Sequence, residues 1–586
     1  MAVAVLSCPI YGAAQRPQAI NLGFVGAGSS AAFNAFAFAA IGLGGSTTPA
    51  CEATGSGGIN IWTKKKGTLQ GVDSRTSNGV TPSAVNGSAW VTWDGAADGS
   101  TAQTICEYLN IDSVVGNRLF FAQPQATVNF SGGCASSIAA DTGVVPLVSP
   151  VALPANICSA LQGASINAAI SDIRAEDSKY ATERAFETFG TTIMGYKGLG
   201  YCNPCVDTPN RNIGQNILEA YGSSPASAQP VEYNITGTDP ITGTTVPAFT
   251  TFDVGGQVAL VLYNDTDTAT GGLGTGLFTD VGEFVLGRMF AGVLSRTSDL
   301  NTGGGTGLPM SVLMREPLSG TMNTIEYQIT NNAEVKLSQE TNDPTVPPTG
   351  GTSNPLDVPA TCTKAKCTPS GSYRLRVIGT GDMIKHLGLA GTESDNLGKT
   401  TFPDALGYAF FSFGNVAPVA AGGSSCPSGA PPTGCVKYVQ VNGTDPLFSS
   451  YSANPVAPGV LPTCAPPCPG AVSFTHVIDG TYPVWNVLRV ITQTSHPAPL
   501  ASALVAGAQV EVSNVPDFVP LASLLAFRSH YNQCSNVGCT TTITGKDGNN
   551  AGIVESGGDV AGAVFQIKND KNYDTDTGKE LTGFKQ

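Results

Sequence analysis

Charged side chains are scarce in this chain: Asp, Glu, Lys and Arg together make up only 12% of its 586 residues. Acidic residues outnumber basic ones by 43 to 29, which gives a formal net charge of −14. Proteins that bind nucleic acids place clustered Lys and Arg against the phosphate backbone. The one dense basic run, residues 64–66, is typical of a solvated turn. The composition therefore predicts no nucleic-acid partner.

Histidine is rare as well, and the four copies are His386, His476, His496 and His530. None stands at ligand spacing from a cysteine pair, whereas a zinc site or a metallophosphatase centre needs several such ligands together. A Gly-x-Ser-x-Gly nucleophile turn beside a base is not evident either. The sequence therefore predicts no metal, no cofactor and no catalytic residue, and a phosphoester hydrolase is the weakest interpretation.

Long apolar runs are missing beyond the N-terminus, where none reaches the roughly 18 residues of a membrane span. Residues 2–8 are apolar and small residues follow at 12–14, which is similar to the remnant of a signal peptide over residues 1–14. The usual basic start is absent. Val-Leu-Ser-Cys also loosely resembles a lipoprotein cleavage site, so a lipid anchor at Cys8 stays open. Either reading predicts a periplasmic or extracellular protein.

Cysteine, in contrast, is plentiful, with 15 copies. Five pairs are close in sequence: Cys202 and Cys205, Cys362 and Cys367, Cys426 and Cys435, Cys464 and Cys468, and Cys534 and Cys539. Such pairs in Gly/Pro/Thr-rich loops predict local disulfides in an oxidising compartment. A zinc knuckle, and a redox centre at the first pair, are the competing interpretations. The partners of Cys51, Cys106, Cys134 and Cys158 cannot be assigned from spacing.

The order of apolar runs predicts an α/β fold. Buried strands are expected at 19–25, 166–170, 257–263 and 309–314, and helices at 32–40, 281–294 and 322–329. Alternation of strand and helix favours parallel sheets, and the length favours two or more lobes. Residues 45–165 are interpreted as a β-rich insertion with strands at 89–93 and 119–122, and residues 421–470 as a Cys-rich loop.

Two strand-to-helix turns have the composition of anion sites. The first is Gly26-Ala27-Gly28-Ser29-Ser30, and the second is Ser319-Gly320-Thr321 with Arg315 just upstream. Free backbone N–H groups and the dipole at a helix N-terminus favour an anion, and a guanidinium fork suits a tetrahedral oxyanion. Asp172 follows another buried strand, where open α/β sheets bind ligands. An ordinary loop salt bridge from Arg174 to Asp172 or Asp177 is an equal alternative.

These motifs resemble a known family. In chain order they are Gly26-Ala27-Gly28-Ser29-Ser30, Ser171-Asp172-Ile173-Arg174, Arg315 with Ser319-Gly320-Thr321, Leu406-Gly407-Tyr408-Ala409-Phe410 and Thr481-Tyr482-Pro483-Val484-Trp485. The chain resembles the periplasmic phosphate-binding proteins of ABC importers, with their type II periplasmic binding fold, as an enlarged variant with insertions. The resemblance implies mixed, mostly parallel sheets in two lobes, 20–244 plus 405–586 and 245–404, with crossovers near 245 and 405.

The resemblance also implies site roles. Ser30, next to Ser29, would donate a hydroxyl, Asp172 would accept the proton of the ligand, Arg315 would balance charge, and Ser319, Gly320 and Thr321 would donate from the second lobe. Pro317 stands where classical members of the family carry a second acidic residue. The implied partners are phosphate or a similar oxyanion and an ABC importer membrane component. The alternative is a secreted or surface structural protein that self-associates and has a degraded cleft.

Overall fold

The computed structural model describes a defined part of the chain. The described residues are 19–43, 49–52, 58–76, 81–82, 84–94, 102–175, 178, 200–203, 233–290, 294, 296–300, 307–315, 318–325, 329, 373–377, 379–395, 401–416, 419–420, 426–427, 434–463, 472–509, 517–519, 572–574 and 579–581. The predicted signal-peptide remnant at 1–14, Cys8 and Pro317 lie outside them.

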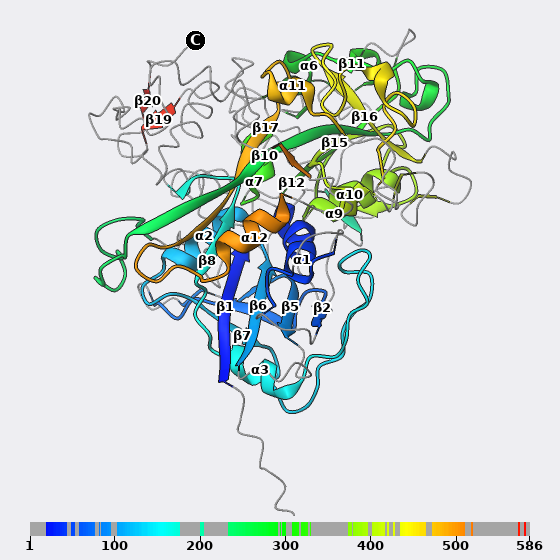
Figure 1. The fold of residues 1–586 in the computed structure, drawn as a ribbon. Helices are drawn as coiled ribbons and strands as arrows, with labels where there is room; N and C mark the ends of the chain where they lie inside the picture. Colours follow the sequence, from blue (N-terminus) through cyan, green and yellow to red (C-terminus); the bar gives the residue numbers. More distant parts are fainter. Residues whose placement is uncertain are drawn as a thin grey trace, which may run out of the picture.

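The fold is built on one large mixed sheet of 15 strands (Figure 1). Its first strand group has a parallel centre and an antiparallel edge: β8 (Ala168–Ser171), β1 (Ala19–Gly28) and β6 (Ala102–Asn110) are parallel, and β5 (Ser88–Asp94) and β2 (Ile59–Lys64) extend it. The second strand group has parallel β9 (Gly200–Asn203), β13 (Tyr373–Val377), β12 (Ser311–Arg315) and β15 (Ala405–Phe410), with β14 (Ser394–Asp395) at its edge.

Two long antiparallel strands join these groups. β10 (Phe249–Asn264) pairs with β17 (Trp485–Gln493) over residues 249–258 and with β15 over 259–263, while β17 pairs with β8. The green β10 and orange β17 run across the middle of the molecule in Figure 1. The α/β class and the mixed sheet are confirmed, although antiparallel pairs form more of the sheet than the predicted mostly parallel arrangement.

The strands that follow the boundary expected near residue 405 pair with β10. β15 and β16 (Val436–Val441) both pair with the C-terminal half of β10, and β16 also pairs with β11 (Asp280–Val281). The described part of residues 405–441 therefore lies beside the second strand group, and the predicted division into two lobes stays a prediction. Backbone pairing with β10 is the physical reason, and the chain returns to the first group only at β17.

The helices of the described residues pack against the strands of the sheet, as α2 (Ser113–Phe121) does against β1 and β8 and α9 (Thr380–Gly388) against β15. The others are α1 (Phe33–Ile41), α3 (Ala155–Leu161), α6 (Glu283–Phe290), α7 (Gly320–Ile325), α10 (Phe413–Val416), α11 (Thr475–Ile478) and α12 (Ala501–Ala508). The short strands are β3 (Leu69–Val72), β4 (Val85–Asn86), β7 (Thr127–Phe130), β18 (Phe518–Val519), β19 (Asn572–Asp574) and β20 (Lys579–Leu581). None of the helices in the described residues is both long and apolar enough to cross a membrane.

Local sequence explains helix α1 and its packing. The run is rich in Ala and Phe, begins after a 3-10 turn at Ser30–Ala32, and ends at Gly42, whose φ of 66° is the left-handed cap that glycine favours. A cluster of buried aromatic side chains, including Phe36, Trp90 and Tyr108, packs between α1 and the first strand group. Small residues let α12 lie close to α1 (Figure 1).

One predicted strand is wrong. Residues 119–121 end helix α2 and are not part of a strand. An apolar run of this length does not distinguish a strand from a buried helix, and every residue of α2 is buried, so the helix has no exposed face to reveal its period. The strand expected at 89–93 is confirmed within β5, which belongs to the large sheet.

Three disulfides occur among the described residues. Cys426–Cys435 is confirmed as a local pair, and Cys51–Cys106 and Cys134–Cys158 resolve the partners that spacing left open. Such bonds are typical of proteins that fold in an oxidising compartment.

The other four predicted cysteine pairs stay predictions. In one of them Cys202 is in β9, whereas Cys205 is outside the described residues. Both members of the remaining three pairs are outside the described residues: Cys362 and Cys367, Cys464 and Cys468, and Cys534 and Cys539.

Candidate functional site

The candidate site lies where the two strand groups face each other at the carboxyl ends of their parallel strands. β1, β6 and β8 end there on one side, and β12 and β13 end there on the other. Each of β1, β6, β12 and β13 is followed within a few residues by a helical turn. Ligand sites of open α/β sheets lie at such strand ends, and here two sets of them converge.

The turn after β1 holds Ser29 and Ser30 in different roles. Gly28 has a φ of 145°, and a Cβ there would fall 2.0 Å from the Ile170 carbonyl oxygen, so this approach to β8 requires glycine. Ser29 Oγ accepts a hydrogen bond from Ala31 N at 3.3 Å and caps the turn. Ser30 Oγ lies 3.1 Å from Thr380 Oγ1 at the start of α9, so the two hydroxyls share a hydrogen bond across the strand groups.

Arg315 is the buried cation of the site, with 1% of its surface exposed. Its Nη1 donates to Thr321 Oγ1 at 3.2 Å and to Thr380 Oγ1 at 3.1 Å, and its Nη2 donates to Ser30 Oγ at 3.3 Å. Asp112 Oδ1 lies 3.9 Å from Nη2. Two of the predicted site residues, Ser30 and Thr321, thus contact the guanidinium of a third, Arg315.

Asp172 is fully buried beside this group. Its Oδ1 accepts a hydrogen bond from the Ser113 hydroxyl, whereas Oδ2 has no hydrogen-bond partner among the described residues. Its backbone oxygen accepts from Asn486 Nδ2 at 2.5 Å. Burial raises the pKa of the Asp172 carboxyl to about 6, although the Ser113 hydrogen bond and the charges of Arg315 and Arg489 oppose the rise. The carboxyl can therefore change protonation near neutral pH.

The Ser-Gly-Thr turn reaches the same place from the second strand group. Ser319 Oγ accepts from Met322 N at 3.4 Å, and Ser319 O accepts from Asn323 Nδ2 at 2.8 Å, so this serine shapes the start of α7. Gly320 lies against the Asp172 carboxyl, with no room for a side chain. Thr321 is the member of the turn whose hydroxyl contacts Arg315.

Sequence reasoning missed three members of the site: Asp112 and Ser113 at the start of α2, and Thr380 at the start of α9. The signal was present for Thr380, because Gly379-Thr380-Gly381 follows β13 as a Gly/hydroxyl turn before a helix. Asp112 and Ser113 follow β6 in the same way. The Gly/Ser turn pattern used for residues 26–30 would have found Thr380, but residues 110–113 contain no glycine and do not fit it.

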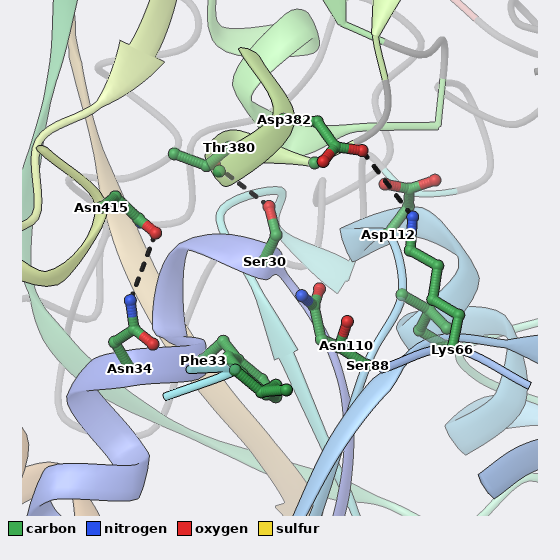
Figure 2. Close-up of a pocket in the computed structure, with 14 residues that line it drawn as sticks. Ser30, Phe33, Asn34, Lys66, Ser88, Asn110, Asp112, Thr380, Asp382 and Asn415 are labelled. Atoms are coloured by element: carbon green, nitrogen blue, oxygen red, sulfur yellow. Dashed lines mark hydrogen bonds and ion pairs between the residues drawn. The ribbon is translucent and has the colours of Figure 1, made fainter. Parts of the chain in front are cut away.

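A pocket of about 150 Å³ opens next to the Ser30 and Thr380 hydroxyls (Figure 2). Contacts between the two strand groups cross its rim: Asn34 Nδ2 donates to Asn415 Oδ1 at 3.2 Å, and Lys66 Nζ lies 3.9 Å from Asp382 Oδ2. Asp172, Ser319, Gly320 and Thr321 do not line it. Arg315 links the pocket wall at Ser30 and Thr380 to Thr321.

No protein-family model and no curated protein sequence matches the chain. Solved structures of phosphate-binding proteins are similar to it at low identity. One from Stenotrophomonas maltophilia is 12% identical, covering 73% of this chain and 88% of that chain, with a TM-score of 0.29. A phosphate ABC transporter substrate-binding protein from Clostridium perfringens, solved with bound phosphate, is 12% identical, covering 44% and 65%, with a TM-score of 0.23. A phosphate transport receptor from Vibrio cholerae is 13% identical, covering 46% and 71%, with a TM-score of 0.21.

The similarity to the Clostridium perfringens protein spans just under two thirds of that protein's length. At these identities and TM-scores the likeness assigns no role to any residue of the site.

Proposed function

We propose that this chain is an exported solute-binding protein that binds a small oxyanion, phosphate, between its two strand groups without chemically changing it. The observation that carries the proposal is the buried Arg315 guanidinium, whose Nη atoms lie 3.1–3.3 Å from hydroxyls of both strand groups. A buried cation ringed by hydroxyl donors is complementary to a tetrahedral oxyanion. Ser29, Ser319 and Gly320 shape the turns, while Ser30, Thr321 and Thr380 supply the hydroxyls.

Asp172 gives this site a basis for selecting among anions. Its Oδ2 is buried without a partner in the described part of the chain, and a protonated phosphate can donate a hydrogen bond to it. Sulfate carries no proton near neutral pH, so it would face a bare carboxylate. Specificity of this kind arises from an unfavourable pairing with the wrong ligand.

The proposal includes a location and a partner. A protein with disulfides is suited to the periplasm or the extracellular space, reached through a signal peptide at residues 1–14 or held by a lipid at Cys8. The two strand groups would act as lobes that open and close on the ligand, with β10 and β17 as the crossing strands. An ABC importer membrane component would receive the ligand, with no catalysis and no cofactor.

Calorimetric titration of the purified chain with phosphate, arsenate and sulfate tests the proposal. We expect phosphate and arsenate to bind and sulfate to bind at least tenfold more weakly. Asp172→Asn should narrow the gap between phosphate and sulfate, because it removes the repulsion of unprotonated anions. If the wild-type chain binds no oxyanion, the better interpretation is a secreted or surface structural protein that self-associates and has a degraded cleft.

A further inference from the structure

The pocket beside Ser30 and Thr380 is larger than a small oxyanion requires. One water-sized group needs roughly 10–15 Å³ of such space, so a pocket of about 150 Å³ has room for about ten. A tetrahedral oxyanion, one central atom with its oxygens, would fill only about half of it. The remaining space lies next to the proposed anion position, because Ser30 and Thr380 line the pocket and also contact Arg315.

The wall of this space combines polar and apolar groups, and its charged side chains are Lys66, Asp112 and Asp382. Its neutral polar groups include the amides of Asn34, Asn110 and Asn415 and the hydroxyl of Ser88. The Lys66 and Asp382 charges lie 3.9 Å apart at the rim and offset each other. Figure 2 shows these side chains around the pocket, with Phe33 beneath them. Amides both donate and accept hydrogen bonds, and an aromatic ring gives an apolar contact, which together complement a hydroxyl-rich carbon skeleton.

Asn34 supplies an independent indication of a ligand contact in the pocket. Its side chain is 5% exposed, and its Nδ2 donates to Asn415 across the strand groups. Its Oδ1 is buried without a hydrogen-bond partner among the described residues. Gly414 lies directly beside the amide, since a Cβ on residue 414 would fall 2.8 Å from Nδ2. A buried acceptor normally has a donor, and a ligand hydroxyl entering the pocket would provide one.

We infer that the preferred ligand is a phosphorylated sugar or polyol, with its phosphate at Arg315 and its hydroxyl-bearing part in the pocket lined by Asn34, Ser88 and Asn110. This inference rests on the proposed oxyanion function and names the substrate class of the same site. Ser30 and Thr380 lie between Arg315 and the pocket and share a hydrogen bond of 3.1 Å, so the ester linkage of the ligand would take the place of this contact.

Direct comparison of ligands on the full-length chain tests the inference. The probes are glucose 6-phosphate, ribose 5-phosphate and glycerol 3-phosphate, set against inorganic phosphate and glucose in calorimetric titration. We expect at least one of the three phosphate esters to bind tenfold or more tightly than inorganic phosphate, and glucose alone to show no binding at millimolar concentration.

The outcomes separate the two proposals. If inorganic phosphate binds as tightly as every ester or more tightly, the inference is wrong and the oxyanion function stands. If neither phosphate nor any ester binds, the oxyanion function fails and the inference fails with it. If glucose binds as tightly as glucose 6-phosphate while inorganic phosphate does not bind, the pocket is a sugar site and the oxyanion function is wrong.

Variants connect the preference to the pocket. Asn34→Ala should lower the affinity ratio of the best ester over inorganic phosphate by tenfold or more. Asn21→Ala is the matched control, since Asn21 is exposed at the opposite end of β1. If Asn34→Ala does not fold, as judged by circular dichroism, Ser88→Ala removes a single oxygen from the same pocket and should lower the ratio in the same direction. An unchanged ratio in the folded variants would overturn the assignment of the pocket.

Discussion

Gly320 and Asp172 are in direct contact across the two strand groups: a Cβ on residue 320 would fall 1.4 Å from Asp172 Oδ1 and 2.1 Å from its Cγ. The carboxyl is itself buried and held by Ser113, so it has little room to retreat. The close approach of α7 to the end of β8 therefore depends on the absence of a side chain at this position.

Gly320→Ala should therefore weaken ligand binding and lower the melting temperature together. We expect more than a tenfold loss of phosphate affinity by calorimetry, because the new methyl group has to push α7 and Asp172 apart. Gly282→Ala is the control, since among the described residues a Cβ there would meet a single atom within 4 Å, Asn442 Oδ1 at 4.0 Å. Unchanged phosphate affinity in Gly320→Ala would mean that ligand binding does not require the close contact between residue 320 and the Asp172 carboxyl.

Arg315→Ala should remove the charge-assisted contacts to the anion. Truncating one member of a buried charged pair costs on the order of 2–5 kcal/mol of binding, which is more than tenfold in affinity. Arg288→Ala removes the same charge from α6, where the guanidinium lies over the Phe284 ring, and should leave binding unchanged. Equal phosphate affinity in both variants and in the wild type would place the anion elsewhere.

The stability of the chain should depend on pH through Asp172. Burial raises its pKa from 3.8 to about 6, so the folded state holds this proton more tightly than the unfolded state. The contribution of this tighter proton binding to the free energy of unfolding is fully present below about pH 4, and it is lost as pH rises through about 6. At about 1.4 kcal/mol per tenfold change in proton affinity, the effect is on the order of 3 kcal/mol.

Asp172→Asn should remove this dependence, because the amide is neutral at every pH in the range. Urea unfolding of both proteins at pH 4.5 and 7.5 measures the pH dependence of the free energy of unfolding. At pH 7.5 the free energy of unfolding of the variant should be higher than that of the wild type. Equal stability differences between wild type and variant at both values would show that Asp172 does not titrate in this window.

The disulfides should differ in what they contribute to stability. Cys51–Cys106 closes a loop with a sequence separation of 55, and Cys426–Cys435 one of 9. Restriction of the unfolded chain predicts about 4 kcal/mol for the first and about 2.5 kcal/mol for the second. Paired Cys→Ser replacements, compared by urea unfolding, should therefore show the larger loss when Cys51 and Cys106 are replaced. A larger loss from replacing Cys426 and Cys435 would contradict the loop-length argument.

The sequence determined the features that depend on neighbouring residues. Buried strands, the turn at 26–30 and the approach of Arg315 to Thr321 were all predictable, because alternating burial and Gly/Ser turns act within a few residues. The same local view failed at residues 119–122, where a short apolar run fits both a strand and a buried helix. Cys426–Cys435 was found because its two members are close in the chain.

The tertiary structure decided what joins distant parts of the chain. Ser30 and Thr380 are 350 residues apart and Asn34 and Asn415 are 381 apart, yet each pair is in hydrogen-bond contact. Cys51 pairs with Cys106, and the described part of 405–441 lies beside the second strand group, because β10 offers its edge to β15 and β16. The composition of a turn shows that it suits an anion, but only the packing of two strand groups on β10 and β17 decides which turns meet and how much space is left between them.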